Sequence, residues 1–164
     1  MDRFAPYLLD RLIDRSPGMP DEATRPMLTI EQLKETVARD VESLLNTRCG
    51  VAADDVARFQ NVRRSMLRFG LDDFAARSLA STDDQAEICL ALARAISDHE
   101  PRLRQVRVEL NRRDSAVRRL KFAIRAVLYV HPMQAPVNFD AVLQTATQQY
   151  AVTASRRLTE TPSP

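Results

Sequence analysis

The sequence predicts an α+β fold in which N-terminal helices pack on a small, mainly antiparallel β-sheet in the C-terminal half. Apolar residues recur at helical spacing before residue 100, and two segments there begin with a helix-capping pattern. After residue 103, apolar and polar residues alternate, as they do in half-buried strands. Pro101 lies where the pattern changes, and a proline disfavours helical geometry in the residue before it.

Three segments are expected along the chain. Residues 1–27 should form an amphipathic stretch and a linker, because residues 4–14 carry an apolar stripe and residues 15–27 contain three prolines and a glycine. That stretch could dock on a partner or fold back on the core. Residues 28–154 should form a single α+β domain, and residues 155–164 a disordered polar tail.

The first long helix is predicted to begin at Ile30, because Thr29 and Gln32 have capping-box spacing. Glu42 should face solvent, and Gly50 offers a C-terminal stop. The buried stripe is expected to contain Ile30, Leu33, Val37, Val41, Leu44 and Leu45.

The next segment is less regular. Residues 63–74 are expected to form a short helical or extended piece that ends at Gly70 and buries Phe69 and Phe74. Gly70 is an isolated glycine, whereas a phosphate-binding loop needs several glycines to free its backbone amides. No nucleotide-binding loop is therefore predicted.

A second helix is predicted over about residues 83–98, because Thr82 and Gln85 repeat the capping spacing. Cys89 is interpreted as a small core residue, since no neighbour would lower the pKa of its thiol. The apolar stripe of this helix contains Ile88, Leu92 and Ile96.

The strands are predicted from alternation. The longest pattern extends from Leu120 to Leu128, and shorter ones cover Val106 to Leu110 and Val137 to Leu143. Pro132 and Pro136 are expected to end the central unit. Residues 141–151 also fit a helix, but a hairpin with an edge strand around Tyr150 and Val152 is the interpretation adopted.

Pairing of the first two strands would place four basic side chains on one face: Arg107, Arg119, Lys121 and Arg125. Like charges across strands repel, so this face requires anions or the single acid Glu109. It could dock on an acidic protein or simply be solvated. Nucleic acid is not expected as a partner, because exposed aromatic residues do not alternate with the basic ones.

Composition indicates a soluble cytoplasmic protein. The 164 residues, with 45% hydrophobic and 28% charged, fit one globular domain. No apolar run approaches the roughly 20 residues of a membrane span, and the N-terminus lacks a signal peptide, so no membrane insertion is expected. Two cysteines form no disulfide framework and favour a reducing compartment.

The most distinctive chemistry lies at Glu100, Pro101 and Arg102. A carboxylate at a helix C-terminus opposes the helix dipole by about 0.3–1 kcal/mol when exposed, so Glu100 needs a partner. Arg102 could provide one inside the fold, or both charges could contact another protein. The sequence leaves a structural clasp and a partner interface open.

No catalytic, cofactor-binding or metal-binding residues are predicted. A glycosidase would need a second carboxylate about 5–9.5 Å from Glu100, and neither Asp98 nor Glu109 is well placed to supply it. The absence of Trp also leaves little to line a sugar cleft. His99 and His131 are isolated in the sequence, whereas zinc needs several converging ligands.

Five stretches occur in an order known from one protein family: Leu8 to Leu12, Asp40 to Arg48, Ser65 to Phe74, Glu100 to Leu103 and Val137 to Asp140. In this order the chain resembles TssE, the family of type VI secretion baseplate subunits related to the sheath-initiator wedge proteins of phages. The family usually has Tyr-Gly-Leu-Pro-Asp where this chain has Phe69 to Asp73, so the local loop is expected to differ.

The resemblance implies a non-enzymatic structural subunit in a cytoplasmic baseplate at the inner-membrane face. It implies contacts with the baseplate proteins TssF, TssG and TssK, and with the sheath proteins TssB and TssC, whose polymerisation would begin by strand addition at an exposed edge. The family's Glu-Pro-Arg motif, implicated in wedge assembly, corresponds to Glu100, Pro101 and Arg102.

Two other functions are weighed against this role. A regulatory protein-binding adaptor of the same fold type is the main alternative. The phage relatives have been labelled lysozyme-like, but nothing in the sequence supports a peptidoglycan hydrolase.

Overall fold

A computed structural model describes residues 4–5, 27–56, 58–73, 81–111, 119–131 and 133–155. The chain divides into two compact units, residues 1–37 and 38–164, and the boundary falls inside helix α2 (Ile30–Asn46). Most of the expected N-terminal helix and linker, the polar tail after residue 155, and Phe74 lie outside the described residues.

In the first unit, the start of α2 is capped as the sequence predicts. The backbone N–H of Thr29 donates to Gln32 Oε1 at 2.8 Å, and the N–H of Gln32 donates to Thr29 Oγ1 at 3.3 Å. These reciprocal bonds satisfy two donors that the first helical turn leaves free. Just before the cap, Leu28 forms an antiparallel bridge with Phe4, with N–H···O distances of 2.9 and 2.7 Å.

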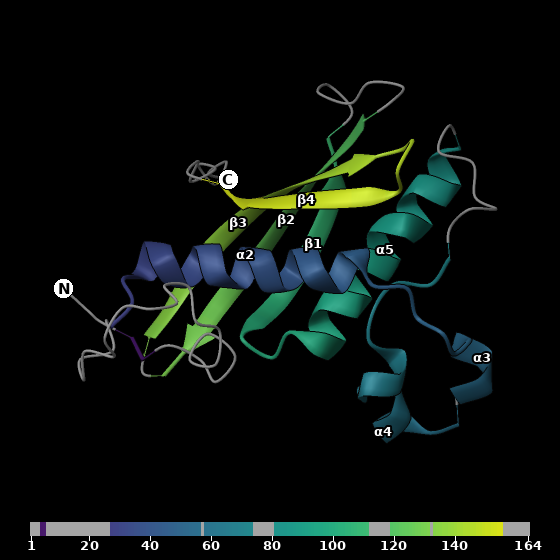
Figure 1. The fold of residues 1–164 in the computed structure, drawn as a ribbon, viewed down its shortest axis with the longest axis horizontal. Coiled ribbons are helices and arrows are strands. Elements are labelled where there is room, and N and C mark those ends of the chain that lie inside the picture. The colour runs from purple at the N-terminus through teal and green to yellow at the C-terminus, as the bar shows by residue number, and fades with distance from the viewer. Residues whose placement is uncertain are drawn as a thin grey trace, which may run out of the picture. The chain divides into compact units, whose positions relative to one another are not determined.

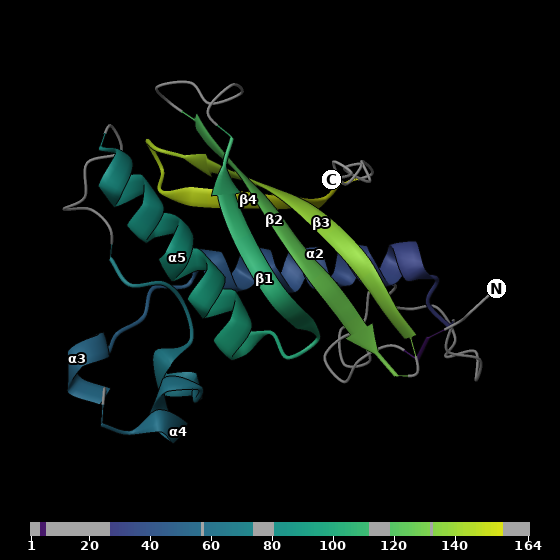
Figure 2. The same ribbon diagram turned by 180° about the vertical axis from the view of Figure 1, so that it is seen from behind.

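The second unit contains one antiparallel sheet with the strand order β1-β2-β3-β4 (Figures 1 and 2). This sheet, preceded by helices, confirms the predicted α+β fold. The hairpin interpretation of residues 141–151 is confirmed, and the helical alternative is wrong. The strands are β1 (Leu103–Leu110), β2 (Arg119–Val130), β3 (Met133–Gln144) and β4 (Gln149–Ala154).

One face of this sheet is apolar and buried. Alternate residues of β2 and β3, including Phe122, Ile124 and Phe139, are almost fully buried. Helix α5 (Thr82–His99) packs along β1, and the C-terminal half of α2 crosses the sheet on one side (Figures 1 and 2). Each such buried side chain contributes roughly 1.5–3 kcal/mol. Within residues 38–164, the buried apolar residues of these two helices are Ala38, Val41, Leu44, Leu45, Ile88, Leu92 and Ile96.

The prediction that Pro136 ends the central unit is wrong, because β3 begins at Met133 and continues through Pro136. The reason is the length of β4, whose described residues pair only with Phe139–Gln144. Next to Pro136, β3 therefore has a neighbour only on the β2 side, where Val127 lies opposite. A proline without an N–H is tolerated where a strand is an edge. β2 ends at Val130, and Pro132 itself lies outside the described residues.

Helix α5 begins one residue earlier than the capping pattern suggests. Its N-cap is Ser81, whose Oγ accepts a hydrogen bond from the N–H of Asp84 at 3.3 Å. Asp83 and Asp84 lie in the first turn, where acids interact favourably with the helix dipole.

Short helical elements connect α2 to α5: α3 (Ala53–Val56), α4 (Gln60–Arg63) and the 3₁₀ helix η1 (Met66–Arg68). Gly70, after η1, has φ +115° and passes close to the end of α2. There the N–H of Leu71 donates to the carbonyl of Thr47 at 2.8 Å, and that of Cys49 donates to Leu71 at 2.9 Å. Pairing with this segment ends α2 at Asn46, so the predicted stop at Gly50 is wrong.

Gly70→Ala should lower the free energy of unfolding by about 1–3 kcal/mol, because φ is unfavourable for a side chain. A Cβ there would also lie 2.5 Å from the Thr47 carbonyl oxygen. Denaturant unfolding measures the change. Gly50→Ala is the matched control, since a Cβ at Gly50 has nothing within 4 Å. Equal stability of the two variants would contradict the role given to Gly70.

Candidate functional site

The corner between α5 and β1 consists of Glu100, Pro101 and Arg102. Glu100 caps α5, and its backbone N–H donates to the carbonyl of Ile96 at 2.8 Å. The N–H of Leu103 donates back to the carbonyl of Glu100 at 3.1 Å, which closes a turn around the exposed Pro101. The helix therefore ends where the proline predicts.

The guanidinium of Arg102 binds two carboxylates. Its Nε donates to Glu100 Oε1 at 2.6 Å and its Nη2 donates to Glu100 Oε2, which makes a bidentate pair. Nη2 also donates to Oδ2 of Asp40, on α2, at 2.6 Å. The Arg102 side chain is 13% exposed and that of Glu100 is 8% exposed. Burial lowers the pKa of Arg102, but the hydrogen bonds and charges of Glu100 and Asp40 outweigh it and raise that pKa above its ordinary value.

The same residue connects the corner to the sheet. The backbone carbonyl of Arg102 accepts a hydrogen bond from the N–H of Tyr129, on β2, at 2.8 Å. Arg102 thus links α2, the end of α5, the start of β1 and β2. The partner that Glu100 needed lies inside the fold, so the structural clasp is present. A contact of this motif with another protein stays a prediction.

The four predicted basic residues share the open face of the sheet. Arg107 lies directly opposite Arg125. Arg119 and Lys121 are on the same face of β2 as Arg125, because every second residue of a strand points to the same side. Arg125 Nη1 donates to Glu109 Oε1 at 3.1 Å, as the charge pattern required. Both side chains are about half exposed, at 46% and 58%, and such a pair adds only about 0–1 kcal/mol.

Two further residues of this face were not singled out from the sequence. Arg104 lies over the ring of Tyr129, with its guanidinium carbon 4.3 Å from the ring centroid. Asp140, on β3, is exposed on the same face and lies opposite Ala123. These contacts cross between strands, and only the register of the sheet determines them.

Side chains of α2 occupy part of the β4 edge. Asn46 Oδ1 accepts from the N–H of Tyr150 at 2.8 Å, and Asn46 Nδ2 donates to the Tyr150 carbonyl at 2.9 Å. Glu42 Oε2 accepts from the N–H of Val152 at 2.7 Å. The prediction that Glu42 faces solvent is therefore wrong, because the helix passes beside an unpaired strand edge that its carboxylate satisfies.

No metal-binding cluster is found in the part of the chain that the structure describes. There, no group of three or more His, Cys, Asp or Glu residues is placed to hold a metal ion. Cys89 is partly buried rather than a core residue as predicted, and burial is the main cause that raises the pKa of its thiol. Phe69 packs edge-on against His99, with ring centroids 5.5 Å apart, and Phe74, its expected aromatic partner, lies outside the described residues. None of the described helices is long and apolar enough to span a bilayer.

Comparison with known proteins relates the chain to one family. The family model for baseplate wedge protein gp25 matches residues 31–133. The chain belongs to this family. TssE is the type VI homologue of gp25, so the resemblance identified in the sequence is confirmed.

The wedge-family match includes α5, the Glu100–Arg102 corner, β1 and β2. The chain is also similar to the isopropyl malate synthase htyA of Aspergillus rugulosus, at 30% identity over 129 residues. That alignment covers 73% of this chain and only 20% of the enzyme, so the chain spans about a fifth of that relative. No solved structure matches.

Arg102→Ala should lower the free energy of unfolding by about 3–5 kcal/mol, because the buried carboxylate of Glu100 would lose its charged partner. Arg102→Lys should restore part of the loss, since an ammonium keeps the charge but not the bidentate geometry. Chemical denaturation measures both. Arg104→Ala, an exposed neighbour, is the control, and an Arg102→Ala variant as stable as this control would contradict the clasp.

His99 should make stability fall as the pH drops. Burial is the main cause that lowers its pKa below the ordinary 6.5, so the folded chain binds this proton more weakly than the unfolded chain. Its contribution is therefore complete above about pH 6.5 and is lost as the pH falls.

The test compares melting temperatures at about pH 7 and about pH 5. His99→Gln should reduce the drop between the two pH values. His131→Gln, at the other histidine, which is exposed, should leave the drop unchanged. An identical drop in all three proteins would refute the assignment to His99.

Proposed function

We propose that this chain is a non-enzymatic structural subunit of a type VI secretion baseplate wedge and helps to initiate the contractile sheath. The observation that supports this most is membership in the gp25 wedge family over residues 31–133. In this role the chain would assemble in the cytoplasm, at the inner-membrane face, with TssF, TssG and TssK. TssB and TssC would then polymerise on the completed baseplate.

The chemistry of the corner favours a structural role over hydrolysis. A general acid must present a proton to a substrate, whereas both carboxylate oxygens of Glu100 are bound by Arg102. The side chain is also 8% exposed, which leaves little surface for a substrate. The motif therefore suits a rigid joint better than a catalytic group.

The proposed contribution of Glu100, Pro101 and Arg102 to wedge assembly is mainly indirect. The clasp fixes the C-terminal half of α2, α5 and the first two strands in one arrangement. Partner surfaces on these elements then have a defined geometry, which reduces the entropy lost on binding. Pro101 is exposed and Asp40 is 39% exposed, so these two can touch a partner directly.

The basic face is the proposed docking surface for an acidic partner. Arg107, Arg119, Lys121 and Arg125 are exposed there. The β4 edge is less accessible, because Asn46 and Glu42 already bind its backbone at Tyr150 and Val152. A sheath strand that pairs with this edge would have to displace these side chains or pair beyond them.

Co-expression with TssF, TssG and TssK tests the proposal. The wild-type chain should co-purify with them, and a Lys121→Glu/Arg125→Glu variant should bind more weakly, with a salt-dependent deficit. Arg48→Glu, an exposed arginine just after α2 and outside this face, is the control. Addition of TssB and TssC then tests whether sheath assembly starts on the complex.

Capture of one regulatory protein without any baseplate subunit would support an adaptor instead. Loss of turbidity in a peptidoglycan suspension would support a hydrolase. Equal assembly of the Lys121→Glu/Arg125→Glu variant and the wild type at low salt would eliminate the basic face as the docking surface.

A further inference from the structure

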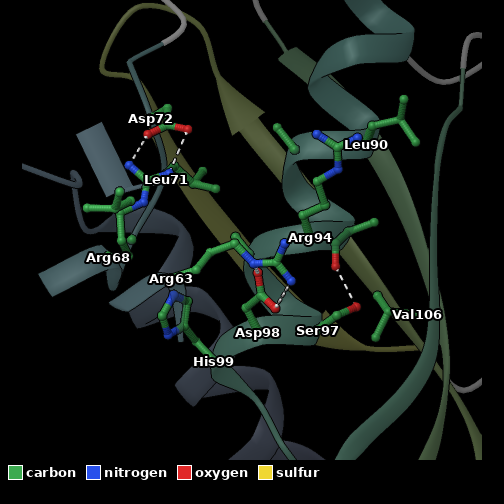
Figure 3. Close-up of a pocket in the computed structure, with 15 residues that line it drawn as sticks. Arg63, Arg68, Leu71, Asp72, Leu90, Arg94, Ser97, Asp98, His99 and Val106 are labelled. Atoms are coloured by element: carbon green, nitrogen blue, oxygen red, sulfur yellow. Dashed lines mark hydrogen bonds and ion pairs between the residues drawn. The ribbon is translucent and has the colours of Figure 1, made fainter. Parts of the chain in front are cut away.

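A groove separates α5 from the segment that contains α4 and η1 (Figure 3). It encloses about 570 Å³. One wall is α5, with Leu90 and Arg94 projecting from it, and the other contains Arg63, Arg68 and Asp72. Both walls belong to the second compact unit. None of the functions considered above uses this groove.

Leu90 is an exposed apolar side chain that lines the groove, and other exposed apolar side chains belong to the segment that contributes the opposite wall. Within the described residues of 38–164, every exposed large hydrophobic side chain belongs to α5 or to residues 59–67. They are Phe59 at 60% exposure, Met66 at 81%, Leu67 at 63% and Leu90 at 55%. Single exposed apolar residues are normal, but their concentration on α5 and on the short segment that adjoins the groove is typical of a binding surface.

The walls of the groove are held in place by ion pairs. Arg68 Nη1 and Nη2 donate to the two carboxylate oxygens of Asp72 at 2.8 and 3.1 Å, and Nη1 also donates to the Val51 carbonyl. Arg63 reaches across to Asp98 of α5, with Nε 3.3 Å from Oδ2 (Figure 3). These contacts preorganise the groove, so little ordering is required when a ligand binds.

The charge left after this pairing is positive. Arg94 lines the groove and is exposed, and it has no ion-pair partner among the residues that the structure describes. The charge of Arg64 lowers the pKa of His99, which lines the groove. Arg64 also lacks a carboxylate partner among the described residues. Apolar side chains next to uncompensated arginines complement a ligand that is apolar on one side and acidic on the other.

The backbone of the walls indicates the shape of that ligand. α5 is a continuous helix, and the turns of residues 56–69 bond to one another, for example from Val62 N–H to Phe59 and from Arg68 N–H to Ser65. α5 and these turns therefore offer side chains rather than a strand edge, and β1 contributes Val106 to the lining. Recognition by side chains in a groove is the mode of an amphipathic helix, not of an added strand.

We propose that this groove binds an acidic amphipathic helix of a partner protein, with apolar residues packing on Leu90 and the 59–67 segment and a carboxylate on Arg94. If the proposed function holds, that helix belongs to a wedge subunit. The half-buried Ala91 and Ala95 on α5 leave room for a close approach of two helices. This surface is distinct from the basic face of the sheet.

A synthetic probe tests the groove independently of the baseplate. Fluorescence polarisation measures the binding of two labelled amphipathic peptides. One has Leu on one face and Glu on the other, and the matched peptide has Lys in place of Glu. The Leu/Glu peptide should bind, and Leu90→Ser or Arg94→Glu should each weaken binding about tenfold or more. Arg119→Glu, on the open sheet face, is the matched charge control and should change binding little.

Equal binding of the two peptides, or binding that depends on Arg119 and not on Arg94, would overturn the proposal. Circular dichroism of each variant distinguishes lost binding from lost folding. Both substituted groove residues are exposed, so their variants should remain folded.

Zero-length carbodiimide cross-linking then locates the helix in the wedge complex. Lys34 and Lys121 are the only lysines of the sequence, so Arg94→Lys adds one reactive amine in the groove. A new cross-link from position 94 to an acidic helix of a wedge subunit supports the proposal. Assembly of the complex without any cross-link at position 94 overturns it.

Failure of the wild-type chain to assemble with the wedge subunits rejects the proposed function instead. The peptide measurement then still decides whether the groove binds an acidic helix.

Discussion

The arrangement of helices and strands in the second unit depends on one buried guanidinium. The guanidinium of Arg102 holds Glu100 by two hydrogen bonds and reaches Asp40 at 2.6 Å, and the backbone carbonyl of Arg102 accepts a hydrogen bond from the N–H of Tyr129. Charged groups removed from water are stable only when oppositely charged partners bind them in good geometry. Each of these three side chains therefore depends on the other two. The exposed proline between Glu100 and Arg102 turns the chain so that both side chains can meet. A motif of three residues therefore fixes elements that are far apart in the sequence.

The Glu100–Arg102 pair bonds within the fold, so it differs from the surfaces that are proposed to bind partners. The basic sheet face and the groove beside α5 project exposed side chains, and both carry positive charge that few described acids compensate. They differ in chemistry, since the sheet face is mainly polar whereas the groove combines arginines with exposed apolar residues. Two surfaces of different character suit a subunit that has more than one neighbour in an assembly.

Both edges of the sheet are modified in ways that limit unwanted strand pairing. At the β4 edge, the carboxamide of Asn46 bonds to the N–H and carbonyl of Tyr150, as a neighbouring backbone would. In β1 the pairing is interrupted between Arg104 and Arg107, and Gln105 there has φ 55°. Side-chain caps and bulges at edges protect a free subunit from aggregation. Strand addition to this sheet is therefore possible only at backbone positions that these features leave accessible.

The sequence alone determined the element types, the capping box at Thr29, the alternation that places the basic residues on one face, and the wedge family. These are local patterns, and their spacing follows from the geometry of helices and strands. It misplaced the stop of α2 and the role of Pro136, because the first depends on pairing with Leu71 and the second on how far β4 extends. It also left the role of Glu100 open. Only the tertiary structure brought Asp40 and Tyr129 to Arg102 and placed Glu42 on the backbone of β4. Contacts between residues so distant in the sequence are decided by packing and not by local pattern.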